Sequence, residues 1–153
     1  IPRTGYLAQF YAKDFKGLAD TYWVRFRKNN KLINNPSSIS IAYDGGFSPG
    51  SQSDGLTFIL PLRQSINDGL YQHGDSVTVE LYSITNEAYL FLFQVRQEST
   101  NAGIFATPPA NIPSNMFNLN TKSTKKAIGF FCVSGVSTFS IVIDKAKALP
   151  SSR

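Results

Sequence analysis

The feature that most constrains the fold is a change of hydrophobic period within HGDSVTVELYSITNEAYLFLFQ, residues 73–94. Residues 77–84, VTVELYSI, alternate between apolar and polar side chains, which is typical of a strand with one buried face. Residues 85–98, TNEAYLFLFQVRQE, instead place their apolar side chains at helical spacing. Neither Gly nor Pro separates the two patterns. The stretch therefore predicts a strand that turns directly into an apolar helix, which packs back over a face of the sheet.

The ends of this helix carry recognisable signals. Ser83 or Thr85 can serve as N-cap, because a hydroxyl oxygen accepts a hydrogen bond from a free backbone N–H in the first turn. Gly103 is placed to end the helix near the C′ position. These signals predict a helix over about residues 85–101. The alternative is one continuous strand over residues 77–95, which would be unusually long.

Short apolar runs between turn residues predict the other strands. In TYWVRFRK, Tyr22, Val24 and Phe26 share one face, which we expect to be the core side, and the residues between them face water. The expected strands are residues 5–13, a hairpin over 21–33 that turns at Asn29-Asn30, then 38–44, 56–62, 77–84, 127–135 and 136–144.

The fold class that follows is mainly β. We expect an antiparallel β-sandwich or open barrel of about seven to eight strands with one covering helix. The chain of 153 residues is the size of one domain. The sequence thus predicts a single β-rich domain over residues 1–153, with residues 145–153 as a tail.

The charge pattern argues against a nucleic-acid binder. The net charge is +5, but a nucleic-acid-binding surface would gather its Lys and Arg on one face. The densest basic group is Lys122, Lys125 and Lys126, within a polar stretch. We interpret it as a solvated loop and expect no nucleic-acid partner.

Few residues suit catalysis or metal binding. The chain has one His, His73, in a Gly-Asp turn, and one Cys, Cys132, in an apolar run where we expect it to be buried. No Gly-rich phosphate loop and no nucleophile elbow is present. Glu80, on the polar side of a strand, is the best candidate for a glycosidase carboxylate. We expect no enzyme activity, no cofactor and no metal site.

Two places are candidates for binding. The first is the face formed by Trp23, Arg25 and Arg27, since exposed Trp and Arg are typical anchors of interfaces. The alternative is that these side chains only cover one another or lie under a loop. The second is the Pro- and Asn-rich connection IFATPPANIPSNMFNLNTKST, whose length is typical of a functional loop. Its candidate residues are Phe105, Asn111 and Asn115.

The order of segments resembles that of a known family. GYLAQFYAKDFKGLADTYWVRFRKNNK resembles the start of the second half of a family of Bacteroidota surface lipoproteins, catalogued as domain of unknown function 4249. GDSVTVELYSITNEAYLFLFQV, IFATPPANIPSN and AIGFFCVSGVS follow in the family's order, so the resemblance covers residues 5–143. The chain departs from the pattern after Asn115, where the family has Gly-Gly and this chain has MFNLNTKSTKK.

The resemblance implies the carboxy-terminal part of a longer lipoprotein, anchored to the outer membrane on its periplasmic or surface side by a lipid on an upstream segment. It implies a non-enzymatic cell-envelope binding domain, an accessory of a TonB-dependent outer-membrane transporter in nutrient uptake. No catalytic residue is carried over. The alternatives are a glycan-binding module and a carrier of a small apolar ligand held between helix and sheet.

Overall fold

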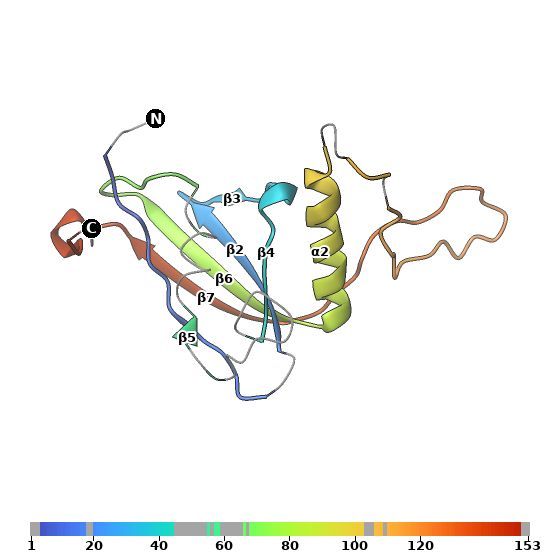
Figure 1. The fold of residues 1–153 in the computed structure, drawn as a ribbon, viewed down its shortest axis with the longest axis horizontal. Helices are drawn as coiled ribbons and strands as arrows, with labels where there is room; N and C mark the ends of the chain where they lie inside the picture. Colours follow the sequence, from blue (N-terminus) through green and yellow to red (C-terminus); the bar gives the residue numbers. More distant parts are fainter. Residues whose placement is uncertain are drawn as a thin grey trace.

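The computed structural model describes residues 4–17, 20–44, 55, 57–58, 66, 68–102, 106–108 and 110–150. Figure 1 shows a twisted sheet with one helix on it and a long projection beyond the helix. The elements are β1 (Ala12–Lys13), β2 (Thr21–Lys28), β3 (Lys31–Ile33), the 3₁₀ helix η1 (Pro36–Ser38), β4 (Ser40–Tyr43), β5 (Thr57–Phe58), β6 (Ser76–Ile84), α2 (Asn86–Thr100), β7 (Gly135–Val142) and the 3₁₀ helix η2 (Lys145–Lys147).

The main sheet is antiparallel and open. β2 and β6 pair along eight residues at its centre, from Thr21↔Ile84 to Lys28↔Val77. β3 and β4 pair with successive halves of the outer edge of β2, and β7 pairs with the other edge of β6. β1 and β5 form a separate two-stranded pair. The predicted mainly β fold with one helix is therefore confirmed, and the sheet does not close into a barrel.

The predicted hairpin after β2 is confirmed. Asn29 and Asn30 have φ values of 50° and 61°, and Lys28 pairs with Lys31 across them. Two successive positive φ angles define the turn that matches the twist of a two-residue hairpin, and Asn tolerates them better than most residues.

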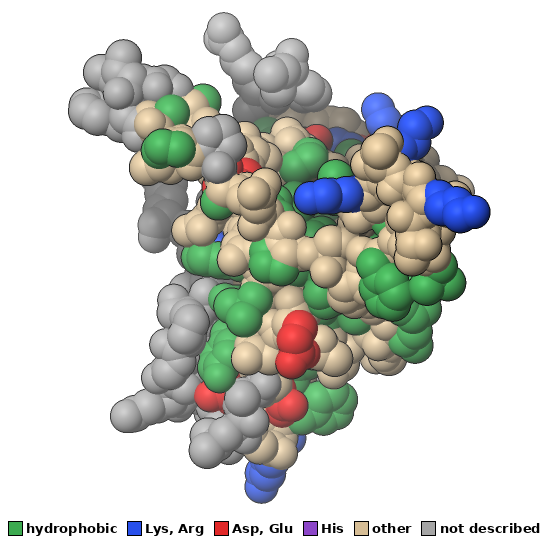
Figure 2. Space-filling model, turned by 90° about the vertical axis from the view of Figure 1, so that its right-hand side faces the viewer, with side chains coloured by type: hydrophobic (Ala, Val, Ile, Leu, Met, Phe, Trp, Pro, Cys, Tyr) green, Lys and Arg blue, Asp and Glu red, His purple; other side chains and the backbone are tan. Residues whose placement is uncertain are grey.

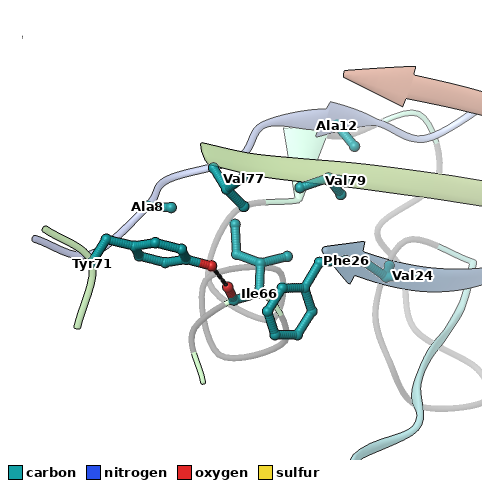
Figure 3. Close-up of a cluster of buried hydrophobic side chains, with 8 residues drawn as sticks. All are labelled: Ala8, Ala12, Val24, Phe26, Ile66, Tyr71, Val77 and Val79. Atoms are coloured by element: carbon teal, nitrogen blue, oxygen red, sulfur yellow. Dashed lines mark hydrogen bonds between the residues drawn. The ribbon is translucent and has the colours of Figure 1, made fainter. Parts of the chain in front are cut away.

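One sheet face carries the larger core cluster, drawn in Figure 3. As predicted, Val24 and Phe26 are buried there, together with Val77 and Val79 of β6. The segment before β1 crosses this face and is tied to the sheet region by an antiparallel bridge between Tyr6 and Tyr71. The remaining members of the cluster are Ala8, Ala12, Ile66 and Tyr71.

The opposite face is covered at one end by α2. Ala88 and Tyr89 of α2 pack with Ile41 and Ile84 in a second buried cluster. Thr85 is the N-cap, since its hydroxyl accepts the Ala88 N–H at 3.3 Å. The predicted helix and its packing over the sheet are confirmed; Gly103 lies outside the described residues.

The predicted strand over residues 127–135 is wrong. This segment has no ladder partner in the described structure, and β7 begins at Gly135. Three of its apolar side chains, Ile128, Phe131 and Val133, point into solvent. Cys132 is exposed as well, so the expectation of a buried thiol is also wrong. An apolar run of strand length failed here because no neighbouring strand offers its backbone groups a partner.

Two further strands are shorter than predicted. Of residues 5–13, only Ala12–Lys13 form a strand, and of residues 56–62 only Thr57–Phe58 are described as one. Most of the remaining residues of the second segment lie outside the described part of the chain. In the described residues, no helix is long and apolar enough to span a membrane.

Candidate functional site

The polar end of the α2-covered face holds five interacting side chains, which we call the Glu80 network: Trp23, Arg25 and Arg27 of β2 with Glu80 and Tyr82 of β6. Arg27 Nε donates to Glu80 Oε1 at 3.0 Å, and the Tyr82 hydroxyl donates to Glu80 Oε2 at 2.9 Å. The Arg25 guanidinium lies 5.0 Å from the Trp23 ring centre and 5.7 Å from that of Tyr82. Such distances are typical of cation–π contacts.

The electrostatics of this network keep Glu80 ionised. Burial raises the pKa of its carboxyl, but the hydrogen bonds from Tyr82 and Arg27 and the charges of both arginines outweigh burial, so the pKa is lowered. A glycosidase acid needs a raised pKa at neutral pH. Glu80 therefore links β2 to β6 as a carboxylate.

Trp23 is half-buried rather than presented to solvent. Its ring lies 5.5 Å from that of Tyr82 and packs against the cluster under α2. A sugar-stacking platform needs a free aromatic face, and Arg25 lies over that of Trp23. The geometry matches the alternative in which these side chains cover one another; a binding role for Trp23, Arg25 and Arg27 stays a prediction.

Of the three candidates after α2, the structure describes Asn111 and Asn115. Phe105 lies outside the described residues, and Asn111 is exposed. The Asn115 side chain bonds both backbone groups of Phe131: its Nδ2 donates to the carbonyl and its Oδ1 accepts the N–H, each at 2.7 Å. Asn115 thus joins two chain segments, and its role in binding is untested.

A pair of adjoining grooves lies on the other sheet face, and sequence reasoning missed it. The larger, about 540 Å³, runs between residues 5–10 and the segment 143–150, with Val77, Val79 and Ile141 on its floor. The smaller, about 450 Å³, continues past Phe10 and Phe15. Phe139 of β7 lines both grooves and is 58% exposed.

β7 itself forms the open side of these grooves. In the described part of the chain it pairs with β6 alone, and all eight of its residues are exposed. Its sequence, GVSTFSIV, contains neither a charge nor a Pro. Natural edge strands are usually blunted by Lys, Pro, bulges or a cover. The uncharged alternation is visible in the sequence, but nothing there says that this strand lies at an edge.

The described residues include no group of three or more His, Cys, Asp or Glu side chains placed to hold a metal ion. His73 lies at the surface, where its Nδ1 accepts the Lys145 N–H at 3.3 Å.

The fold and the grooves define a small mainly β domain built on an open antiparallel sheet, whose uncharged strand β7 pairs with β6 alone in the described part of the chain. The model of the family described as domain of unknown function (DUF4249) matches residues 4–140. The chain belongs to this family. It matches none of the curated proteins and none of the solved structures with which it was compared.

Proposed function

We propose that this is a non-enzymatic binding domain that holds an extended segment of a partner protein along β7. The observation that carries the proposal is the exposed, uncharged edge of β7 beside an apolar groove. An added strand would satisfy the free backbone groups of that edge, and its alternate side chains would enter the groove. The setting we propose is that implied by the family resemblance: a cell-envelope lipoprotein whose partner is a TonB-dependent outer-membrane transporter.

The geometry favours a polypeptide over a glycan as the occupant. Val77, Val79 and Ile141 on the floor of the larger groove offer no hydrogen bonds to sugar hydroxyls, while the polar side chains of Gln9, Asp144 and Lys147 line other parts of it. Main-chain hydrogen bonds would supply affinity and the groove would supply the preference for apolar side chains at alternate positions.

A substitution in β7 tests the proposal. Phe139→Lys places a charge in both grooves and at the middle of the edge strand, where charged side chains discourage pairing. Leu90→Lys makes a similar exchange on α2, where Leu90 is also exposed, and serves as the control. Each immobilised variant is incubated with detergent-solubilised envelope from the source organism, and retained proteins are identified by mass spectrometry.

We expect a transporter to be retained by the unmodified chain and by Leu90→Lys, and to be lost with Phe139→Lys. Equal retention by both variants would show that β7 is not the contact. Retention of no protein would contradict the proposal.

A second candidate is a carrier of a small apolar ligand. The volume of the larger groove, about 540 Å³, lies within the range of small-molecule sites. The groove lies on the sheet face opposite α2, whereas the alternative given in the sequence analysis was a small apolar ligand held between helix and sheet. Mass spectrometry of an organic extract of the purified chain would detect a lipid that Phe139→Lys should release.

A further inference from the structure

The segment 110–134, which we call the arm, projects from the body beyond α2 (Figure 1). Its two branches are joined by side-chain to backbone hydrogen bonds in place of a strand ladder. Ser114 Oγ accepts the Gly129 N–H at 3.1 Å and donates to the Gly129 carbonyl at 2.7 Å. The Asn115–Phe131 pair described above follows next to it. These contacts fix the branches against each other, so the arm has a defined register.

The base of the arm rests on α2. The ring of Phe130 stacks on that of Phe91 with centres 4.8 Å apart and planes 23° apart. Phe130 also packs against the buried cluster beneath the helix. The base is thereby anchored to the body, and the arm projects away from it (Figure 1).

Apolar side chains of the arm point into solvent. Phe117 is 77% exposed and Leu119 83% exposed. Ile128, Phe131 and Val133 on the returning branch are at least 70% exposed. Single exposed apolar residues are ordinary, but a group of this kind on one projecting element marks an interaction site.

All charged side chains of the arm are basic. Lys122, Lys125 and Lys126 lie at its far end, and no Asp or Glu occurs from residue 99 to residue 143. Asn118 Nδ2 donates to the Lys125 carbonyl at 2.9 Å, which holds the segment with Phe117 and Leu119 beside the backbone of Lys125. Figure 2 faces the end of the molecule from which the arm projects and shows basic and hydrophobic side chains close together.

We propose that the arm docks on an anionic lipid surface, with Phe117 and Leu119 inserted at the boundary of the acyl chains and the three lysines at the headgroups. Apolar side chains next to lysines are the combination by which peripheral proteins bind such surfaces. Nucleic acid would favour aromatic stacking partners, whereas most of the exposed apolar side chains here are aliphatic. This site is separate from the groove beside β7 and does not depend on the proposed function.

Vesicle co-sedimentation tests the proposal. The chain is mixed with vesicles of phosphatidylethanolamine and phosphatidylglycerol in equal parts, and in parallel with phosphatidylcholine vesicles. We expect binding to the anionic vesicles only, weakening as salt screens the lysines. Replacing Lys122, Lys125 and Lys126 together by Gln should weaken binding about 100-fold, since each Lys near such a surface contributes about fivefold. Phe117→Ser with Leu119→Ser should weaken it at least tenfold.

The control for charge is the triple variant Lys16→Gln, Lys31→Gln, Lys145→Gln, which removes three exposed lysines from other parts of the surface. The control for apolar surface is Leu90→Ser, which alters a Leu that is 49% exposed on α2, outside the arm. Both controls should bind like the unmodified chain, and circular dichroism should show that every variant is folded. Equal binding to the two kinds of vesicle, equal losses in the arm and control variants, or no vesicle binding would each overturn the proposal.

Discussion

Arg27 donates from Nε to Oε1 of Glu80 at 3.0 Å, although the two residues are 53 positions apart in the chain. The pairing of β2 with β6 places Arg25 directly opposite Glu80 and Arg27 two residues further along. The Glu80 carboxylate thus accepts hydrogen bonds from Arg27 of the neighbouring strand β2 and from Tyr82 of its own strand β6. These contacts tie the two central strands together at Glu80.

Glu80→Gln should lower the free energy of unfolding by about 1–2 kcal/mol at neutral pH, because hydrogen bonds to a charged group are stronger than those to a neutral amide. The pKa of Glu80 is lowered in the folded chain. Its stabilising effect is therefore present above the unfolded value of about 4.3 and is lost as pH falls through the folded value. Urea unfolding at neutral and acid pH measures this difference. Glu98→Gln on α2 is the control, and a gap that persists at low pH would contradict the ionic explanation.

Tyr22→Phe should cost about 1–3 kcal/mol of stability, because it leaves a buried carboxylate short of a donor. The Tyr22 hydroxyl donates to Asp14 Oδ1 at 2.7 Å and accepts the Phe15 N–H at 3.1 Å. Both Tyr22 and Asp14 are almost completely buried. Denaturant unfolding of Tyr22→Phe is compared with that of Tyr11→Phe, whose hydroxyl is exposed. Equal stability of the two variants would show that the Asp14 contact contributes nothing.

The free energy of unfolding should decrease at alkaline pH, and ionisation of the Tyr71 hydroxyl should cause part of this decrease. Burial, followed by the charges of Asp68 and Asp75, raises the pKa of its hydroxyl to about 12, compared with about 10 in the unfolded chain. The contribution is complete below the unfolded value and is lost as pH rises through the folded value. Tyr71→Phe should be less stable at neutral pH by about 1 kcal/mol, since the bond to the Ile66 carbonyl is lost. The difference in free energy of unfolding between the unmodified chain and Tyr71→Phe should decrease as pH rises from about 10 to about 12. A difference that stays constant over this range would contradict the raised pKa of Tyr71.

Asn115→Ala should loosen the arm without unfolding the body. Both backbone groups of Phe131 lose their partner, while the sheet and α2 keep theirs. Hydrogen exchange of the Phe131 amide should become faster, with amides of β2 and β6 unchanged. The matched variant Asn111→Ala alters an exposed Asn in the same segment. Slow exchange at Phe131 in Asn115→Ala would show that the arm is held by other contacts.

Cys132 should react at once with a thiol reagent in the folded chain, because the side chain is exposed. The rate at which the Cys132 thiol reacts in the folded chain should be within a small factor of the rate in denaturant. Cys132→Ser should show no reaction. Protection that disappears only on unfolding would place Cys132 in a buried position and would contradict the structure of the returning branch of the arm.

Local patterns in the sequence were enough to predict the core faces and the helix. The alternation in Tyr22, Val24 and Phe26 reports directly which face is buried, and Thr85 marks the start of α2. The segment containing Cys132 has the same apolar character but pairs with no strand among the described residues, and composition alone does not reveal whether a partner exists. The Glu80 network and the groove beside β7 depend on which strands become neighbours, and this is decided by pairings between distant parts of the chain.

Those distant pairings also govern how the sheet is assembled. Arg25 and Tyr82, 57 positions apart, become neighbours across the central strand pair, and β7 joins only after the long arm. The β2–β3 hairpin is the one local pairing within the main sheet as described. Loop closure over such separations is costly in entropy, so folding should be slow for a domain of this size. During synthesis the free edge of β6 has to wait for β7, and in that interval it is open to mispairing with other chains.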